Sequence, residues 1–215
     1  EIYTLSLHDA LPISSLSEYH EVEHLVREAF WNVYRPGCVE HLILHQFRQH
    51  PNYLENLSKV ILVDGQLAGQ IMFSKAQLRH EQTGQGKEIA TFGPFAILPA
   101  FQKQGFGEKL AQAAIRQARE EGFSHIVLFG NPAYYPKYGF VTASDYGIYL
   151  DGQDKEEILD FVMVLDLQRD GSVTRENGPW LYRDPEGYEV DEAELEMFDR
   201  KFPPKKKEKR PGQLG

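Results

Sequence analysis

Apolar residues recur along the chain with periods that predict helices alternating with strands. Helical spacing predicts a first helix after Ser15-x-x-Glu18, which has capping-box form, and a second helix after the break at Pro36-Gly37. The apolar positions are Val22, Leu25, Val26, Ala29 and Phe30 in the first helix and Val39, Leu42, Ile43 and Phe47 in the second.

A β-hairpin is predicted next, over Val60 to Val63 and Gln66 to Phe73. Its turn is Asp64-Gly65, a pair that supplies the positive φ angles of a type I′ turn. The remaining elements follow in order along the chain: a polar loop from Glu81 to Glu88, a strand from Phe92 to Leu98, a helix from Glu108 to Gly122, a strand from His125 to Gly130, a helical turn near Pro132 to Lys137, a solvated loop from Asp151 to Glu157 and a buried strand from Asp160 to Leu167. The pattern predicts an α/β domain.

Two glycines lie where the predicted strand at 92–98 gives way to the next helix. Gly105 and Gly107 lack the Cβ atoms that would keep an anion away, so the amides of residues 103–108 can converge at the positive end of the helix dipole. A pyrophosphate fits such a site. Pro94 cannot donate to a strand ladder, which predicts a bulge that turns the backbone of Phe95 to Ile97 away from a neighbouring strand.

Better-known phosphate loops do not match this segment. A Rossmann turn needs G-x-G-x-x-G, but Leu110 stands three positions after Gly107, and no acidic residue for a ribose follows the next strand. A P-loop needs Gly-Lys-Ser/Thr, and Gly107 is followed by Glu108. An isolated G-x-G is most often a surface turn that caps an ordinary helix.

The wider context favours the binding interpretation. Gln102-x-x-Gly105-x-Gly107, an Ala-rich helix, a strand and then Asn131-Pro-Ala-Tyr-Tyr-Pro-Lys-Tyr-Gly-Phe140 together resemble the GNAT superfamily of N-acetyltransferases. The Gly-Pro before the glutamine loop and the Pro-Ala-Tyr-Tyr before Gly-Phe are similar to its bacterial YhbS-like branch. The resemblance covers about residues 15–167, with motifs in matching order and spacing.

The resemblance implies a GNAT acyl-CoA N-acyltransferase fold, a mixed central sheet flanked by helices, with acetyl-CoA as co-substrate. In the family the glutamine loop binds pyrophosphate, the bulged strand pairs with pantetheine, and a tyrosine four residues before Gly-Phe protonates the leaving thiolate. That acid is Tyr135 here. A packed aromatic is its alternative role, and helix capping is an equal alternative for Asn131. The implied cofactor-binding residues are Phe95, Ala96, Ile97, Gln102, Lys103, Gln104, Gly105, Phe106, Gly107, Glu108 and Asn131.

The sequence does not single out a general base. An alkyl ammonium, with an ordinary pKa of about 10.4, must lose a proton before it attacks a thioester. Many relatives use a glutamate on the fourth strand, where this chain has Thr91. Glu88 and His80 are near in sequence and Glu40 lies on the second predicted helix, but none stands out.

Composition narrows the functional classes. The chain has 215 residues, 41% of them hydrophobic, which suits one domain with appendages. No apolar run approaches the roughly 20 residues of a membrane span, and the single Cys38 cannot form an internal disulfide, so a cytoplasmic location is expected. A net charge of −9 argues against broad nucleic-acid binding and favours cationic substrates.

Three residues with reactive side chains have ordinary interpretations. Cys38 lies outside the matched motifs, which favours a small apolar filler over a nucleophile. His41 and His45 share a face of the second helix, but no third ligand is near in sequence, so no metal is expected and a solvated or acceptor-lining face is favoured.

We expect four segments. Residues 1–13 resemble the in-frame translation of a DNA-sequencing adapter and are excluded from functional argument. Residues 14–167 form the acetyltransferase domain. Residues 168–200 form an accessory extension, whose Trp180, Tyr182 and Tyr188 pack on the domain and whose helix begins at an Asp191 cap. Residues 201–215 form a basic disordered tail.

The sequence therefore predicts transfer of acetyl from acetyl-CoA to a primary amine of a small molecule or peptide, by a monomer or homodimer that binds neither nucleic acid nor membrane. A non-catalytic acyl-CoA sensor is the alternative from another class. A nucleic-acid-associated protein acting through the Lys205-to-Arg210 run is a third.

Overall fold

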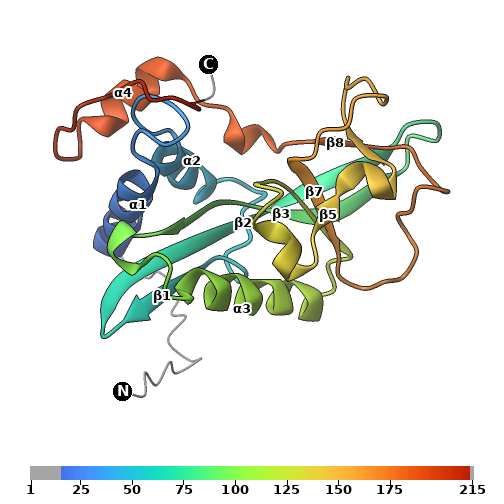
Figure 1. Cartoon of the computed structure of the whole chain (residues 1–215), viewed down its shortest axis with the longest axis horizontal. Helices are drawn as coiled ribbons and strands as arrows, with labels where there is room; N and C mark the ends of the chain where they lie inside the picture. Colours follow the sequence, from blue (N-terminus) through green and yellow to red (C-terminus); the bar gives the residue numbers. More distant parts are fainter. Residues whose placement is uncertain (1–15, 214–215) are drawn as a thin grey trace. The chain divides into compact units, whose positions relative to one another are not determined.

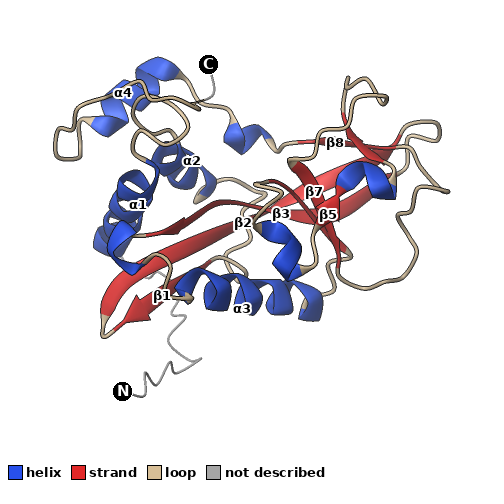
Figure 2. Cartoon of the chain, in the orientation of Figure 1, coloured by secondary structure: helices blue, strands red, loops and turns tan. Residues whose placement is uncertain are grey.

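The computed structural model describes residues 16–213, so the predicted cap at Ser15 and the adapter-like residues 1–13 lie outside the described part. The described chain, drawn in Figure 1, divides into two compact units. One contains residues 16–72, 93–114 and 186–213, and the other contains residues 73–92 and 115–185. The elements of both units are shown in Figure 2. In chain order they are α1 (Leu16–Phe30), α2 (Glu40–Phe47), β1 (Lys59–Val63), β2 (Gln66–His80), β3 (Gly86–Ile97), η1 (Pro99–Phe101), α3 (Phe106–Glu120), β4 (His125–Phe129), η2 (Tyr135–Tyr138), β5 (Val141–Thr142), η3 (Ala143–Tyr146), β6 (Ile148–Leu150), β7 (Val162–Asp166), β8 (Trp180–Arg183), η4 (Glu186–Tyr188) and α4 (Glu192–Asp199).

The first unit is built on the predicted helices and hairpin. β1 pairs antiparallel with β2, and Asp64 and Gly65 have φ angles of 51° and 76°, which confirms the type of turn. One core cluster joins the apolar faces of α1 and α2 to Met72 and Ala96. A second joins Leu42 of α2 to the extension, through Leu195, Phe198 and Phe202. Figure 1 shows α1, α2 and α4 gathered together.

The second unit carries most of the sheet. Its strands pair in the order β5-β7-β4-β3-β2-β8-β6. The pairs β3/β4 and β6/β8 are parallel, whereas β4/β7, β5/β7 and β2/β8 are antiparallel, so the predicted mixed sheet is confirmed. A core cluster that includes Ile89, Val127 and Val164 fills this unit.

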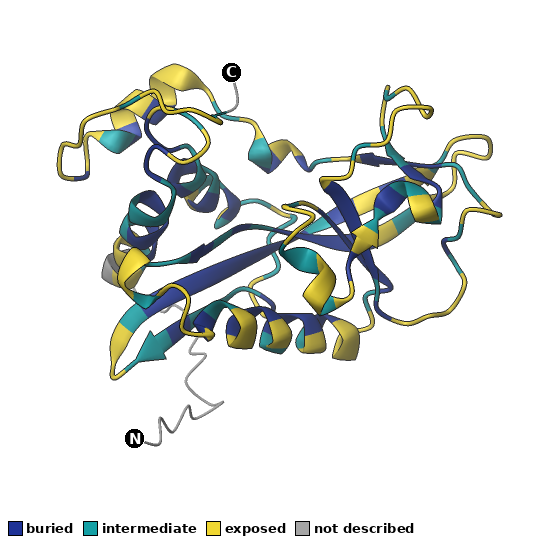
Figure 3. Cartoon of the chain, in the orientation of Figure 1, coloured by how far each residue is buried: buried dark blue, intermediate teal, exposed yellow. Residues whose placement is uncertain are grey.

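Helix α3 follows the glycine turn as predicted. Its buried positions repeat at helical spacing, and Figure 3 shows the buried and exposed faces alternating along it. Gly122, with φ +87°, donates its amide to the Arg119 carbonyl at 3.1 Å just past the last turn. A left-handed glycine there ends the helix, since few other residues adopt that conformation.

The strands differ from the predictions in their length. β2 continues to His80, seven residues past the predicted end at Phe73, and β3 already begins at Gly86, inside the predicted polar loop. The added stretch of β2 pairs with β8, at Gln77↔Arg183 through His80↔Trp180. A partner from so far along the chain leaves no signal in the local pattern.

The C-terminal residues are more structured than the sequence suggests. Asp191 accepts a hydrogen bond from the Glu194 amide at 2.9 Å, which confirms the predicted cap of α4. A disordered tail was expected over residues 201–215, whereas its described part, residues 201–213, makes hydrogen bonds to the rest of the chain. The Lys206 carbonyl accepts from Trp31 Nε1 and Asn32 Nδ2, at 3.0 and 3.1 Å, so the basic segment packs against the end of α1.

Candidate functional site

A cavity of about 440 Å³ lies in the first unit, between the end of β3 and the end of α1. Its lining residues come from segments far apart in sequence: Glu28, Ala29, Phe30, Trp31, Val33, Tyr34, Phe95, Ala96, Ile97, Pro99 and Gln102. Four of the residues predicted to bind the cofactor are among them. The volume is in the range of small-molecule sites, and most of the lining residues are apolar or aromatic, with Glu28 and Gln102 as polar groups.

The end of β3 is held by side chains as well as by its neighbouring strand. Gln70 Nε2 donates to the Pro94 carbonyl at 2.8 Å, and the Tyr188 hydroxyl donates to the Gly93 carbonyl at 3.0 Å. Phe95 and Ile97 are half-buried while Ala96 between them is buried. Phe95 and Ile97 therefore lie on one face of the strand, and Ala96 packs into the core.

Gly69 permits a close approach of β2 to this segment. A Cβ atom at Gly69 would lie 2.3 Å from Ile97 Cδ1 and 2.8 Å from the Ala96 carbonyl oxygen. Any side chain there would push β2 and the cavity-lining segment apart, because the carbonyl belongs to the backbone and has little freedom to move.

The turn between η1 and α3 leaves its backbone available to a ligand. Gln102 Nε2 donates to the Ile97 carbonyl at 3.0 Å and Gln104 Nε2 donates to the Ala100 carbonyl at 2.9 Å, so both side chains brace the loop. Lys103 and Gly105 have φ angles of 60° and 85°. Nothing lies within 4 Å of a Cβ built on Gly105, so its backbone conformation, not crowding, favours glycine here.

Helix α3 begins at Phe106, which places Gly107 inside its first turn. The first intrahelical bond runs from the Lys109 amide to the Gly105 carbonyl, at 3.2 Å. The preceding amides of a helix have no acceptor within the helix and lie at the positive end of its dipole. With exposed Lys103 in the same turn, the segment fits a phosphate group.

Tyr135 lies in the second unit, at the start of η2. Its ring packs near Phe92 and Phe140, with centroid separations of 5.9 and 5.7 Å. A Cβ at Gly130 would lie 2.3 Å from the Tyr135 ring, so the glycine that ends the predicted strand allows the tyrosine to lie against it. The hydroxyls of Tyr134 and Tyr138 lie 3.0 Å apart and bond to each other. The Tyr135 ring also lies against both of these tyrosines, with centroid separations of 5.1 Å to Tyr134 and 6.3 Å to Tyr138.

Asn131 forms a turn and is not a helix cap, since the cap position of η2 is Tyr134 and has no side-chain cap bond. Its Oδ1 accepts from the Ala133 amide at 2.8 Å, and its carbonyl accepts from the Tyr134 amide, also at 2.8 Å. These bonds turn the chain from β4 toward η2. A contact of Asn131 with the cofactor stays a prediction.

The residues weighed as a general base do not line the cavity. Thr91 is buried, Glu88 pairs with Lys75 at 3.4 Å, and His80 Nδ1 accepts the amides of its own turn. Glu40 accepts bonds from Cys38 Sγ and the Val39 amide, at 3.2 and 3.0 Å. The carboxylate residue that does line it is Glu28, which sequence reasoning missed.

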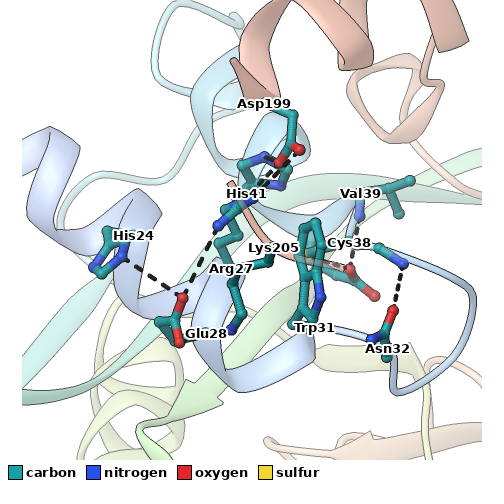
Figure 4. A network of polar contacts seen from close by, with 12 residues as sticks. His24, Arg27, Glu28, Trp31, Asn32, Cys38, Val39, His41, Asp199 and Lys205 are labelled. Atoms are coloured by element: carbon teal, nitrogen blue, oxygen red, sulfur yellow. Dashed lines mark hydrogen bonds and ion pairs between the residues drawn. The ribbon is translucent and has the colours of Figure 1, made fainter. Parts of the chain in front are cut away.

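Glu28 could have been found from its place on the first helix. It lies in the last turn of α1, on a polar face that also carries His24 and Glu21. The helical pattern gives no reason to choose one of these polar residues over the others. The structure separates them, because Glu28 is joined to the cavity and to Lys205 (Figure 4).

Cys38 has the structural role expected of it. Its side chain is buried, and burial raises the pKa of the Cys38 thiol, with the nearby Glu40 charge raising it further. A thiol that stays protonated is a poor nucleophile.

His41 and His45 were expected to share a solvated or acceptor-lining face, but they differ in burial: His45 is exposed and His41 is not. His41 is fully buried and lies 3.3 Å from Asp199, while the His45 ring packs on Phe198 of α4 at 4.5 Å. His45 also pairs with Glu23 at 2.8 Å. Over residues 16–213 no group of three or more His, Cys, Asp or Glu residues could hold a metal ion.

Two further properties bear on the class of protein. Within the described chain, no helix combines the length and the apolar character needed to cross a membrane. The fold and the cavity define an α/β protein in which a glycine turn and a helix N-terminus follow the strand end that lines the cavity, an arrangement whose free amides suit a phosphate group.

The chain belongs to the acetyltransferase (GNAT) family, whose sequence profile matches residues 19–140, more than half of the chain. It is 30% identical over 84 residues to the uncharacterized N-acetyltransferase YjhQ of Escherichia coli strain K12, and 26% identical over 87 residues to YhbS of the same strain. These matches cover 39% and 40% of this chain, and it spans about half the length of each relative, 45% and 48%.

Solved structures agree with the family assignment. A GNAT acetyltransferase from Brucella melitensis in complex with acetyl-CoA superposes with a TM-score of 0.54 at 26% identity, over 75% of this chain and 91% of that one. E. coli YhbS in complex with CoA superposes with a TM-score of 0.62 at 21% identity, over 79% and 87%. The predicted GNAT fold is confirmed.

Proposed function

We propose that this protein transfers the acetyl group of acetyl-CoA to a primary amine, by direct attack of the amine on the thioester in a ternary complex. The observation that carries the proposal is the cavity, because Phe95, Ala96, Ile97 and Gln102 line it together with the end of α1. The family motif assigns Phe95, Ala96, Ile97 and Gln102 to the cofactor. Family folds place the acceptor beside the first two helices, which correspond to α1 and α2. The Brucella relative that matches 75% of this chain was solved with acetyl-CoA.

The proposed roles follow from the chemistry of the step. The amine nitrogen forms a bond to the thioester carbonyl carbon, and the bond from that carbon to sulfur breaks. Backbone amides of the Phe95–Ile97 segment stabilise the charge that develops on the carbonyl oxygen, while the 102–108 turn holds the CoA phosphates. Tyr135 donates a proton to the departing thiolate, on the strength of its place in the motif.

Glu28 acts as the general base, the role that the motif leaves unassigned. A carboxylate beside the acceptor binds an ammonium group and then receives the proton that the amine must lose before attack. The surrounding Phe30, Trp31 and Tyr34 suit the alkyl or aromatic body of an amine, and their rings attract a cation. The chain's negative charge favours the approach of the same cationic acceptors.

A thiol-release assay tests the proposal. Acetyl-CoA is incubated with the protein and a panel of primary amines, and free CoA is measured alongside calorimetric titration with acetyl-CoA. We expect amine-dependent release of CoA. Binding of acetyl-CoA without release, with any amine tried, would instead identify a sensor that does not turn over.

A further inference from the structure

Lys205 places an amine of the chain itself beside the cavity. Its Nζ lies 2.8 Å from Glu28 Oε2 and 5.5 Å from the centroid of the Trp31 ring (Figure 4). Glu28 and Trp31 both line the cavity. The two residues that hold this ammonium group are therefore also part of the site proposed for the acceptor.

The backbone around Lys205 is fixed by hydrogen bonds to the end of α1 and to the loop that follows. The Lys206 carbonyl accepts from Trp31 Nε1 and Asn32 Nδ2, and the Glu208 amide donates to Asn32 Oδ1 at 3.0 Å. These bonds hold the backbone so that Lys205, and not its neighbour Lys206, lies against Glu28. The Lys205 side chain pairs with Glu28 and is 30% exposed. The Lys206 side chain pairs with Glu208 and is 85% exposed.

We propose that Lys205 is an internal acceptor, acetylated by the protein's own acetyl-CoA-dependent activity; the inference rests on the proposed function. Glu28 takes a proton from the Lys205 ammonium, and Nζ then forms a bond to the thioester carbonyl carbon. The bond from that carbon to sulfur breaks, the nitrogen gives up its second proton, and the departing CoA thiolate takes up one proton. The products are Nζ-acetyl-Lys205, CoA and one proton passed from Glu28 to solvent.

Tethering and charge both favour this reaction. A lysine joined to the enzyme by its own chain is present at a high effective concentration. It therefore loses less translational and rotational entropy on reaching the thioester than a separate second substrate would. Acetylation removes the positive charge of Lys205 and with it the ion pair to Glu28. Glu28 Oε2 then becomes available to an external amine, while Oε1 keeps its contacts to His24 and Arg27 at 3.6 and 4.0 Å, so the modified protein binds such an acceptor more readily.

Peptide mass spectrometry of the full-length protein tests the inference. The protein is incubated with acetyl-CoA and no added amine, and acetyl occupancy is measured at each lysine of the 205–209 run. We expect Lys205 to be modified at least tenfold faster than Lys206, at a first-order rate that does not change on dilution of the protein. Glu28→Gln, which keeps the shape of the side chain, should slow modification of Lys205 at least tenfold and leave Lys206 unchanged.

Other outcomes would overturn it. Acetylation that favours the exposed Lys206 over Lys205, or that is insensitive to Glu28→Gln, would show chemical modification of accessible amines. Modification that slows on dilution would show transfer between molecules. External amines acetylated in the same preparation, with Lys205 unmodified, would reject the internal acceptor and leave the proposed function standing. No transfer to either would reject both.

Discussion

Tyr135 shows how much one residue's role depends on its immediate surroundings. Three tyrosines lie within five positions, and only the spacing to Gly139-Phe140 separates them in the sequence. In the structure the hydroxyls of Tyr134 and Tyr138 bond to each other, while the Tyr135 ring packs near Phe92. The spacing could be read from the sequence, but the bond between the other two phenols could not.

Tyr135→Phe should lower turnover and leave the affinity for acetyl-CoA nearly unchanged. The phenol is needed only when negative charge collects on sulfur, and a positioned proton donor contributes on the order of 10²- to 10⁴-fold. The fall is measured as kcat in the thiol-release assay, with affinity from calorimetry.

Tyr134→Phe and Tyr138→Phe are the matched controls, since each removes one hydroxyl from the same short segment. Both should keep turnover within a few-fold of the unchanged protein. Full activity in Tyr135→Phe combined with a loss in Tyr134→Phe would assign the acid to the neighbouring residue.

At the scale of elements, the first turn of α3 is the part of the chain proposed to bind the CoA phosphates. Gly107→Val places a β-branched side chain in that turn, where the phosphate is proposed to approach the backbone. We expect affinity for CoA to fall by roughly 5- to 30-fold, the equivalent of about 1–2 kcal/mol, with little change for pantetheine, which lacks the phosphates.

Ala113→Val is the control on the same helix. It introduces the same side chain about two turns further on, at a cost to helix stability of several tenths of a kcal/mol. Calorimetric titration of both variants separates the two effects. Equal weakening of CoA and pantetheine by Gly107→Val would show that this turn does not hold the phosphates.

The packing of α4 on α1 and α2 gives the fold a pH dependence. Burial lowers the pKa of His41 to about 4, with Asp199 opposing this shift and Arg27 and Lys207 adding to it. The unfolded chain takes up this proton near the ordinary pKa of about 6.5, before the folded chain does. The stabilisation is therefore complete at neutral pH and is lost as pH falls from about 6.5 to 4.

His41→Leu should flatten this dependence, by an amount of order 3 kcal/mol across that range. Urea unfolding of both proteins between pH 7 and pH 4.5 provides the measurement. His125, whose pKa burial also lowers, contributes in the same direction to both proteins and cancels in the difference. Parallel curves would mean that the protonation of His41 differs little between the folded and unfolded chains.

The elements that the sequence predicted are those with local signals. Asp64-Gly65, the Asp191 cap and the apolar face of α3 each specify their structure within a few residues. β8 and the second half of β2 were not predicted, because each strand is defined by pairing with the other about 100 residues away. Such pairings cannot be read from a single window of sequence.

For the molecule as a whole, the main departure from the sequence analysis is the C-terminal segment. A lysine-rich end with no apolar pattern is typical of a disordered tail. Here Trp31, Asn32 and Glu28, more than 170 positions earlier, provide the partners that order it. Glu28 is found by the same long-range contacts, whereas the motif alone had pointed to Phe95, Ala96, Ile97 and Gln102, which line the same cavity.

The central claim is that an acetyl group passes from acetyl-CoA to an amine. The most direct test uses acetyl-CoA carrying an isotopic label in its acetyl group, with product masses and free CoA measured together. If acetyl is transferred, a labelled amide forms on the amine acceptor in a one-to-one ratio with free CoA. Release of CoA with the label recovered as free acetate would show hydrolysis of the thioester and contradict acetyl transfer.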